Sequence, residues 1–260
     1  MKENNNSETG GSTPQKQTAA QTIKGIVILV VVFAVIAVVL SQSGAFAIIN
    51  PGWGFKVLNE KSSEDFDEAL VFIYDTHFTK PSVSGVQKWA TPIKIKVEGN
   101  PSEKDLNALN EIIAAFNTVD GFPGMQIVNS GENVKIIFTT NENYEQIRNM
   151  YTGDSFDKSF CDFNVRNGEI YQANIIMEPG GPQGYRNSVQ LHEFSHMIGF
   201  YNHVDGKTSI MNYNNPVSGM SKTDTLAFKM LYNPEIPIGM PYFRMVDYYD
   251  SMTVDEFLNQ

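Results

Sequence analysis

An uncharged apolar segment near the N-terminus constrains this chain more than any other feature. The 25 residues from Gly25 to Ile49 carry no charge, and only mildly polar Ser and Gln side chains interrupt them. A stretch of about 18 or more such residues can span a bilayer, because a helix satisfies its own backbone hydrogen bonds. We therefore expect one transmembrane helix over residues 23–49, between a disordered polar tail (1–22) and residues 50–260.

A cleaved signal peptide is the alternative, because Ala45-Phe46-Ala47 is similar to a small-residue cleavage site. The long polar head and the length of the uncharged run favour an uncleaved signal anchor instead. Lys16 and Lys24 precede the apolar run, and the next positive charge is Lys56. That distribution predicts a single-pass membrane protein whose N-terminus is cytoplasmic and whose following domain is extracellular.

The composition excludes several classes of site. The net charge of −10 argues against binding to nucleic acid. The single cysteine, Cys161, excludes an intramolecular disulfide and a multi-cysteine zinc site, and it is expected to pack in a strand. His77 has no partner motif and is expected to face solvent at the end of a helix.

The soluble part alternates between strand and helix patterns. Pro92–Val97 alternates apolar and polar residues as a strand does, and Ser102–Asp105 has the pattern that begins a helix. The remaining expected elements are a helix after Ser62, strands near Met125–Val128 and Val134–Thr139, a brief helix at Glu145–Met150, and strands Cys161–Val165 and Glu169–Ile176. The last two form a hairpin about Asn167-Gly168, so we expect an α+β domain with a mixed sheet.

The stretch from His192 to His203 contains three of the four histidines in the chain. On a helix, His192 and His196 lie one turn apart and can bind one metal ion, and Glu193 can act as a general base on a water molecule. Gly199 allows the chain to leave the helix in a left-handed conformation, which can return a third ligand to the metal.

This stretch resembles the metzincin signature H-E-x-x-H-x-x-G-x-x-H, which a methionine turn follows. Ser209–Tyr213 is similar to that turn, and Ser221–Tyr232 is similar to the C-terminal helix of the matrixins. The resemblance implies a zincin domain with a mixed twisted sheet, an active-site helix and a C-terminal helix. It also implies that an antiparallel edge strand, here Glu169–Ile176, binds substrate by strand addition.

The third ligand departs from the strict metzincin spacing by one residue. That spacing nominates Asn202, whereas the next residue is His203. Imidazole is a commoner zinc ligand than an amide oxygen, and a loop can absorb one extra residue. We therefore expect His192, His196 and His203 to bind Zn²⁺, with Asn202 as the alternative.

The resemblance implies a membrane-anchored zinc endopeptidase that acts on a peptide or protein substrate. Glu193 would be the general base, Tyr213 could stabilise the oxyanion, and Met211 would form an apolar floor beneath the ligands. Two alternatives are a catalytically inactive zincin-fold binding module and a gluzincin that takes its third ligand from Asp224. A capping role explains Asp224 better than a ligand role does.

These expectations divide the chain beyond the membrane helix into three parts. Residues 50–90 are expected to be a juxtamembrane segment, residues 91–234 the catalytic domain, and residues 235–260 a C-terminal tail.

Overall fold

The computed structural model divides the chain into two compact units, Met1–Ala47 and Ile48–Gln260. The described residues all lie in the second unit, and they are 63–151, 159–205, 208–212, 217, 219–252 and 257. The expected polar tail and membrane helix therefore lie outside the described residues. Within the described ranges, no helix is both long enough and apolar enough to cross a membrane.

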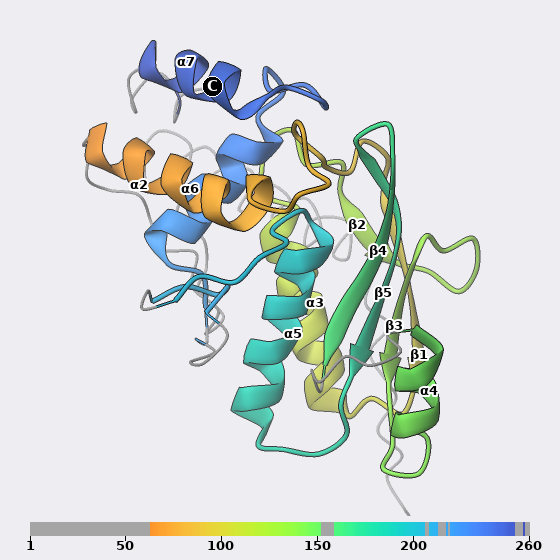
Figure 1. The fold of residues 1–260 in the computed structure, drawn as a ribbon. Coiled ribbons are helices and arrows are strands. Elements are labelled where there is room, and N and C mark those ends of the chain that lie inside the picture. Colours follow the sequence, from red (N-terminus) through yellow and green to blue (C-terminus); the bar gives the residue numbers. More distant parts are fainter. Residues whose placement is uncertain are drawn as a thin grey trace, which may run out of the picture. The chain divides into compact units, whose positions relative to one another are not determined.

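The second unit contains one mixed sheet of five strands, which lies to the right of α3 and α5 in Figure 1. Its order is β2-β1-β3-β5-β4. The strands are β1 (Ile93–Gly99), β2 (Met125–Ile127), β3 (Val134–Phe138), β4 (Phe160–Arg166) and β5 (Glu169–Met177). The first three neighbouring pairs are parallel, and β4 is antiparallel to β5. The α+β fold with a mixed sheet thus agrees with the sequence prediction.

The predicted hairpin joins β4 to β5 through Asn167 and Gly168, whose φ angles are 54° and 81°. Positive φ at both central residues is the geometry that favours Asn-Gly in a two-residue hairpin turn. The predicted position of the edge strand is wrong, however. Glu169–Ile176 belongs to β5, which lies between β3 and β4, and the antiparallel edge strand is β4.

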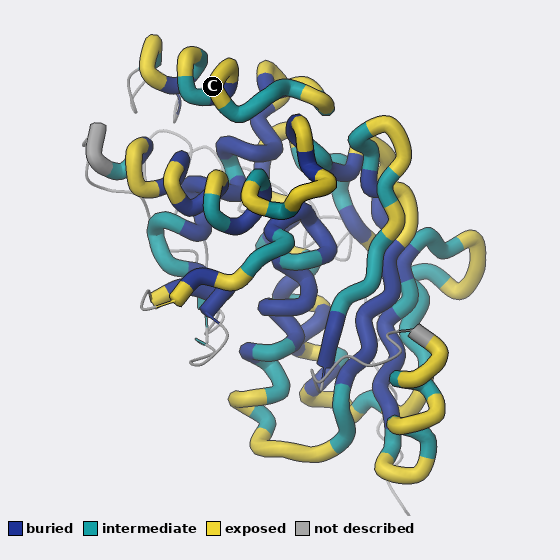
Figure 2. Tube along the Cα trace, in the orientation of Figure 1, coloured by how far each residue is buried: buried dark blue, intermediate teal, exposed yellow. Residues whose placement is uncertain are grey.

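The burial of the two strands explains this order. The run from Ala173 to Met177 is buried at every position, as suits a strand with neighbours on both sides. Most residues of β4 are only half-buried, as suits an edge. Figure 2 shows the same contrast between the dark blue centre of the sheet and its paler margins.

Two helices, α3 (Glu103–Phe116) and α5 (Gln183–Met197), contact each other beside the sheet (Figure 1). The α3 helix begins with the predicted capping box, in which Ser102 and Asp105 exchange side-chain and backbone hydrogen bonds. Asp105 is buried and also accepts hydrogen bonds from Arg186 at 2.9 and 3.0 Å. Burial alone would raise the pKa of Asp105, but bonds from Arg186, Gln183 and Ser102 lower it well below its ordinary value. This carboxylate therefore joins the N-terminal ends of α3 and α5.

The compact unit is wider than the expected domain of residues 91–234. The remaining elements are α2 (Ser63–Ile73), the π-helical turn η1 (Tyr74–Phe78), α4 (Tyr144–Tyr151), α6 (Lys222–Tyr232) and α7 (Tyr242–Asp250). Phe66 and Phe72 of α2 belong to the hydrophobic core, as do Met245 and Tyr249 of α7. The Tyr249 hydroxyl also donates to the carbonyl oxygen of Met230 at 2.8 Å. Segments on both sides of residues 91–234 are thus integral to the folded unit.

Candidate metal centre

The last turns of α5 carry His192, Glu193 and His196. The helix ends at Met197, Ile198 is its C-cap residue, and Gly199 then has a φ of 122°. A Cβ atom at Gly199 would lie 3.0 Å from the Gln87 carbonyl oxygen. Both the positive φ and this close approach favour glycine, so the chain can turn back toward the histidines.

Two fully buried aromatic residues fix the end of α5. The Trp89 indole Nε1 donates to the Met197 carbonyl oxygen at 2.9 Å, and the Tyr232 hydroxyl donates to that of Ile198 at 2.9 Å. The final carbonyl groups of a helix have no partner within it. These two bonds satisfy them from separate parts of the chain and hold the helix end in place.

The loop that follows α5 is bound to η1. The backbone N–H groups of Tyr201 and Asn202 both donate to the Thr76 carbonyl oxygen, at 2.6 and 2.8 Å. The Asn202 side-chain amide donates to Thr79 Oγ1 at 2.6 Å. Asn202 is therefore bonded to the segment around η1, and the next residue, His203, is the one that reaches the histidines of α5. In this way the loop accommodates the one residue by which His203 departs from the strict metzincin spacing.

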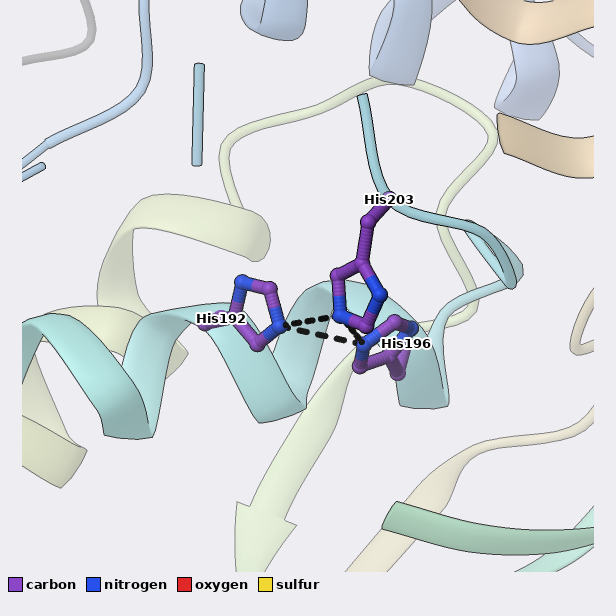
Figure 3. A group of neighbouring side chains, drawn as sticks. All are labelled: His192, His196 and His203. Atoms are coloured by element: carbon purple, nitrogen blue, oxygen red, sulfur yellow. Dashed lines mark hydrogen bonds between the residues drawn. The ribbon is translucent and has the colours of Figure 1, made fainter. Parts of the chain in front are cut away.

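The three histidines converge on one point through their Nε2 atoms (Figure 3). The Nε2–Nε2 distance is 3.0 Å between His192 and His203, 3.1 Å between His192 and His196, and 3.2 Å between His196 and His203. Bonds of about 2.0–2.1 Å from nitrogen to a tetrahedral zinc ion would separate the ligand atoms by about 3.3 Å. The triad thus has almost the spacing of a zinc ligand set.

The opposite ring nitrogens of two histidines are bonded to backbone carbonyl groups. His192 Nδ1 lies 2.5 Å from the Ile210 carbonyl oxygen, and His196 Nδ1 lies 2.6 Å from that of Phe200. Because a carbonyl oxygen only accepts, each Nδ1 carries a hydrogen, and in its neutral form each ring then presents an Nε2 lone pair. Burial, with the neighbouring His192 and His203, lowers the pKa of His196 well below its usual value and favours the neutral ring.

This donor set fits a divalent metal ion. When both rings are neutral, the Nε2 lone pairs of His192 and His196 face each other at 3.1 Å, which is unfavourable unless a cation is shared between them. Such an arrangement, with the tautomer set by bonds at Nδ1, is the usual environment of zinc-binding histidines. His192, His196 and His203 could therefore hold a zinc ion.

A cavity of about 240 Å³ opens beside the triad. Glu193, which is only 4% exposed, lines it together with the three histidines. The other lining residues come from β4 and its start, from the loop after α5 and from the segment after η1: Ser159, Phe160, Cys161, Phe163, Tyr201 and Lys80. The edge strand β4 therefore forms one wall of the cavity that holds the candidate ligands.

The sequence of this chain matches the model of one protein family. The sequence model of a family described as "Protein of unknown function (DUF2927)" matches residues 64–244. The chain belongs to the DUF2927 family. The matched residues include α2 and the start of α7, in agreement with the extent of the folded unit.

The chain was also compared with curated proteins and with solved structures. No curated protein matches this DUF2927 chain. Among solved structures, the chain is similar to high choriolytic enzyme 1, a hatching enzyme zinc-protease from the medaka fish Oryzias latipes. The two are 16% identical with a TM-score of 0.36, and the similarity covers 58% of this chain and 96% of that one.

The segment similar to a methionine turn is bonded to His192 through the carbonyl oxygen of Ile210. Met211 is fully buried, and its carbonyl oxygen accepts from the Val204 backbone N–H at 3.0 Å. Asp224 is also fully buried, and its carboxylate accepts from Ser209 Oγ at 2.6 Å and from the Ile210 N–H at 3.1 Å. Asp224 also caps α6, as the sequence predicted. Both of its carboxylate oxygens therefore already accept hydrogen bonds, from Ser209 and from Ile210. Tyr213 lies outside the described residues.

Sequence reasoning missed the importance of the segment around η1 in this DUF2927 chain. His77 was expected to face solvent, but it is fully buried. Its Nε2 accepts from the Gln87 backbone N–H at 3.1 Å, so its Nδ1 carries the hydrogen bonded to the Gly199 carbonyl oxygen. Burial lowers the pKa of His77 to about 4, so the ring is neutral near pH 7. Its partners lie 10 and 122 residues away in the sequence, so no local sequence pattern indicates them.

Cys161 lies in β4, as expected. Burial raises the pKa of its thiol well above the ordinary value, and Glu193 and Asp162 add to the increase. A thiol held in its neutral form is a poor nucleophile and a poor metal ligand. The role of a packed strand residue therefore suits Cys161 better than a chemical role.

Proposed function

We propose that this DUF2927 protein is a zinc-dependent endopeptidase of the metzincin type. The observation that carries the proposal is the convergence of three Nε2 atoms within 3.0–3.2 Å of one another, beside the buried Glu193. His192, His196 and His203 would hold the zinc ion. A zinc ion bound there would supply Lewis acidity, which polarises a peptide carbonyl and lowers the pKa of water.

Glu193 is the general base in this proposal. Its carboxylate accepts a proton from the water that attacks the peptide carbonyl carbon, and later donates it to the nitrogen of the leaving amine. One C–O bond forms and the peptide C–N bond breaks, so the reaction needs no other reagent. Tyr213 is proposed to donate a hydrogen bond from its hydroxyl to the oxyanion.

The edge strand β4 is the proposed platform for the substrate. Within the described residues β4 pairs only with β5, so one side of β4 retains backbone groups that could pair with a peptide. Phe160, Cys161 and Phe163 of this strand line the cavity that contains Glu193. An extended peptide added to β4 would therefore pass beside the histidines.

The two alternative functions are a gluzincin and an inactive zinc-binding module. The gluzincin alternative needs Asp224 at the metal, but its carboxylate is bound to Ser209 and Ile210. An inactive zinc-binding module would keep the histidines without hydrolysis. The buried Glu193 in the same cavity favours the enzyme, because a purely metal-binding site needs no general base.

Zinc analysis of the full chain tests the metal assignment. We expect one zinc ion per chain after dialysis, and less than about a tenth of that in a His196→Ala variant, because two remaining imidazoles bind zinc weakly. Tyr185→Ala, at an exposed position of α5, is the matched control and should keep its zinc. Elemental analysis, with circular dichroism to check folding, gives the result. Unchanged zinc content in folded His196→Ala protein would remove His196 from the site.

We also propose that residues 23–49 anchor the protein, with the catalytic unit outside the cell. The support is the uncharged apolar run and the flanking positive charges. The full chain should remain in the membrane fraction after carbonate extraction, and protease added to intact cells should digest the catalytic unit. A soluble species that begins near Ile48 would instead show that the segment is a cleaved signal peptide.

A further inference from the structure

A positively charged side chain lines the cavity beside the histidines. Lys80, which follows η1, lines the cavity together with Phe163 of β4 and Tyr201 of the loop after α5. The same cavity contains Glu193 and the three histidines. Lys80 is thus the lysine that borders the candidate catalytic residues.

A stack of aromatic rings holds the Lys80 ammonium in place. Its Nζ lies 4.5 Å from the centre of the Phe163 ring and 4.8 Å from that of Tyr201. The Phe163 and Tyr201 rings are stacked with centroids 4.7 Å apart, and the Tyr201 ring stacks on buried His77 at 5.0 Å. The Tyr201 hydroxyl donates to Gln87 Oε1 at 3.1 Å. The ammonium therefore rests on a platform that is itself fixed.

The charge of Lys80 is incompletely compensated. Within the part of the chain that the structure describes, Lys80 forms no ion pair with a carboxylate, and its Nζ lies beside the stacked rings of Phe163 and Tyr201. Burial lowers the pKa of Lys80, while the neighbouring carboxylate of Asp162 acts in the opposite direction. Ring faces attract a cation but accept no full hydrogen bond, so a partly desolvated ammonium keeps its donors for another group.

We propose that Lys80 binds a carboxylate of the substrate, so that the enzyme prefers peptides with an acidic group near the scissile bond. This inference rests on the proposed peptidase function and names its substrate class. A peptide added to β4 would pass Phe163, and an acidic side chain or a terminal carboxylate could then reach the ammonium. A charge-assisted hydrogen bond in a half-buried site is stronger than a neutral one, which gives the preference its physical basis.

Binding experiments on the full chain carrying Glu193→Gln, which should slow hydrolysis enough for binding to be measured, test the proposal. The probes are terminally blocked, fluorescently labelled octa-alanine peptides in which one Glu, or one Gln as its neutral match, is moved through the inner positions. At one or two positions, the peptide that carries Glu should bind about tenfold more tightly than the peptide that carries Gln at low ionic strength. Added salt should reduce this difference in affinity. A second set of alanine peptides, with free or amidated C-termini, separates a terminal carboxylate from a side-chain one.

Three substitutions identify the residue responsible. Lys80→Met keeps the apolar stem and should make the Glu and Gln peptides bind equally, whereas Lys80→Arg should keep most of the preference. Lys94→Met removes an exposed lysine from β1 and should change nothing. An undiminished preference in Lys80→Met protein, or no preference in the parent protein, would overturn the carboxylate site.

Hydrolysis by the protein without the Glu193 substitution separates this proposal from the peptidase proposal. Cleavage of Glu and Gln peptides with equal kcat/KM would leave the peptidase standing and overturn the carboxylate site. Absence of all cleavage, together with Lys80-dependent binding of Glu peptides, would leave the carboxylate site standing and overturn the peptidase. Absence of both cleavage and binding would overturn both.

Discussion

Glu193→Gln should lower the rate of peptide hydrolysis by about 10²–10⁴-fold, while one zinc ion per chain remains bound. An amide has nearly the shape of a carboxylate but cannot accept a proton from water at neutral pH. Because Glu193 is only 4% exposed and lies in the cavity with the histidines, no bulk solvent base replaces it easily. Cleavage of casein and of a fluorogenic peptide gives the rates, and elemental analysis gives the zinc content.

The matched control is Glu142→Gln, the same chemical change at an exposed position. It should leave both the rate and the zinc content as they are in the unsubstituted protein. If Glu193→Gln hydrolysed peptides at nearly the full rate, Glu193 would have no part in the mechanism. If the unsubstituted protein bound zinc but cleaved nothing, the inactive binding module would be the better description.

His203→Ala should weaken zinc affinity by more than about 100-fold, a larger effect than the 10–100-fold typical of residues that only support a ligand. Asn202→Ala should weaken it by less than about tenfold. The difference follows from geometry, because His203 Nε2 lies 3.0 and 3.2 Å from the other two Nε2 atoms. The Asn202 amide instead donates to Thr79 Oγ1 and only steadies the loop.

Competition with a chromophoric chelator measures both affinities, and circular dichroism shows whether each variant is folded. Since the two substitutions are neighbours in one loop, each serves as the control for the other. A larger loss in Asn202→Ala than in His203→Ala would mean that the strict metzincin spacing holds and that the third ligand is the amide.

Features that depend on near neighbours in the chain could be predicted from the sequence. The capping box at Ser102 and Asp105, the turn at Asn167-Gly168 and the pair His192 and His196 each involve residues within four positions of one another. Such bonds and turns form wherever the local backbone adopts the right angles, so the residues that make them are visible as short patterns. The helices α2, α3 and α4 and the five strands lie near the positions that local patterns indicate, whereas α7 lies in the expected C-terminal tail.

Features that depend on distant parts of the chain could not be predicted in this way. Either strand of the hairpin could have been the edge, and the parallel pairing of Val134 with Ala173 decided it. Likewise, nothing near His77 in the sequence indicates that it would be buried against Gly199, 122 residues away. Pairings of this kind become favourable only once the core has closed around them.

The sequence by itself determined that this chain has an uncharged apolar segment, an α+β pattern and a helix that presents two histidines and a glutamate on one turn. Tertiary structure decided which residue completes the triad, because Asn202 is bonded to Thr76 and Thr79 while His203 lies against His192 and His196. It also brought Lys80 and the edge strand β4 to the same cavity. The reason is physical: local backbone preferences act within a few residues, whereas a binding site is assembled from side chains that only the packed core brings together.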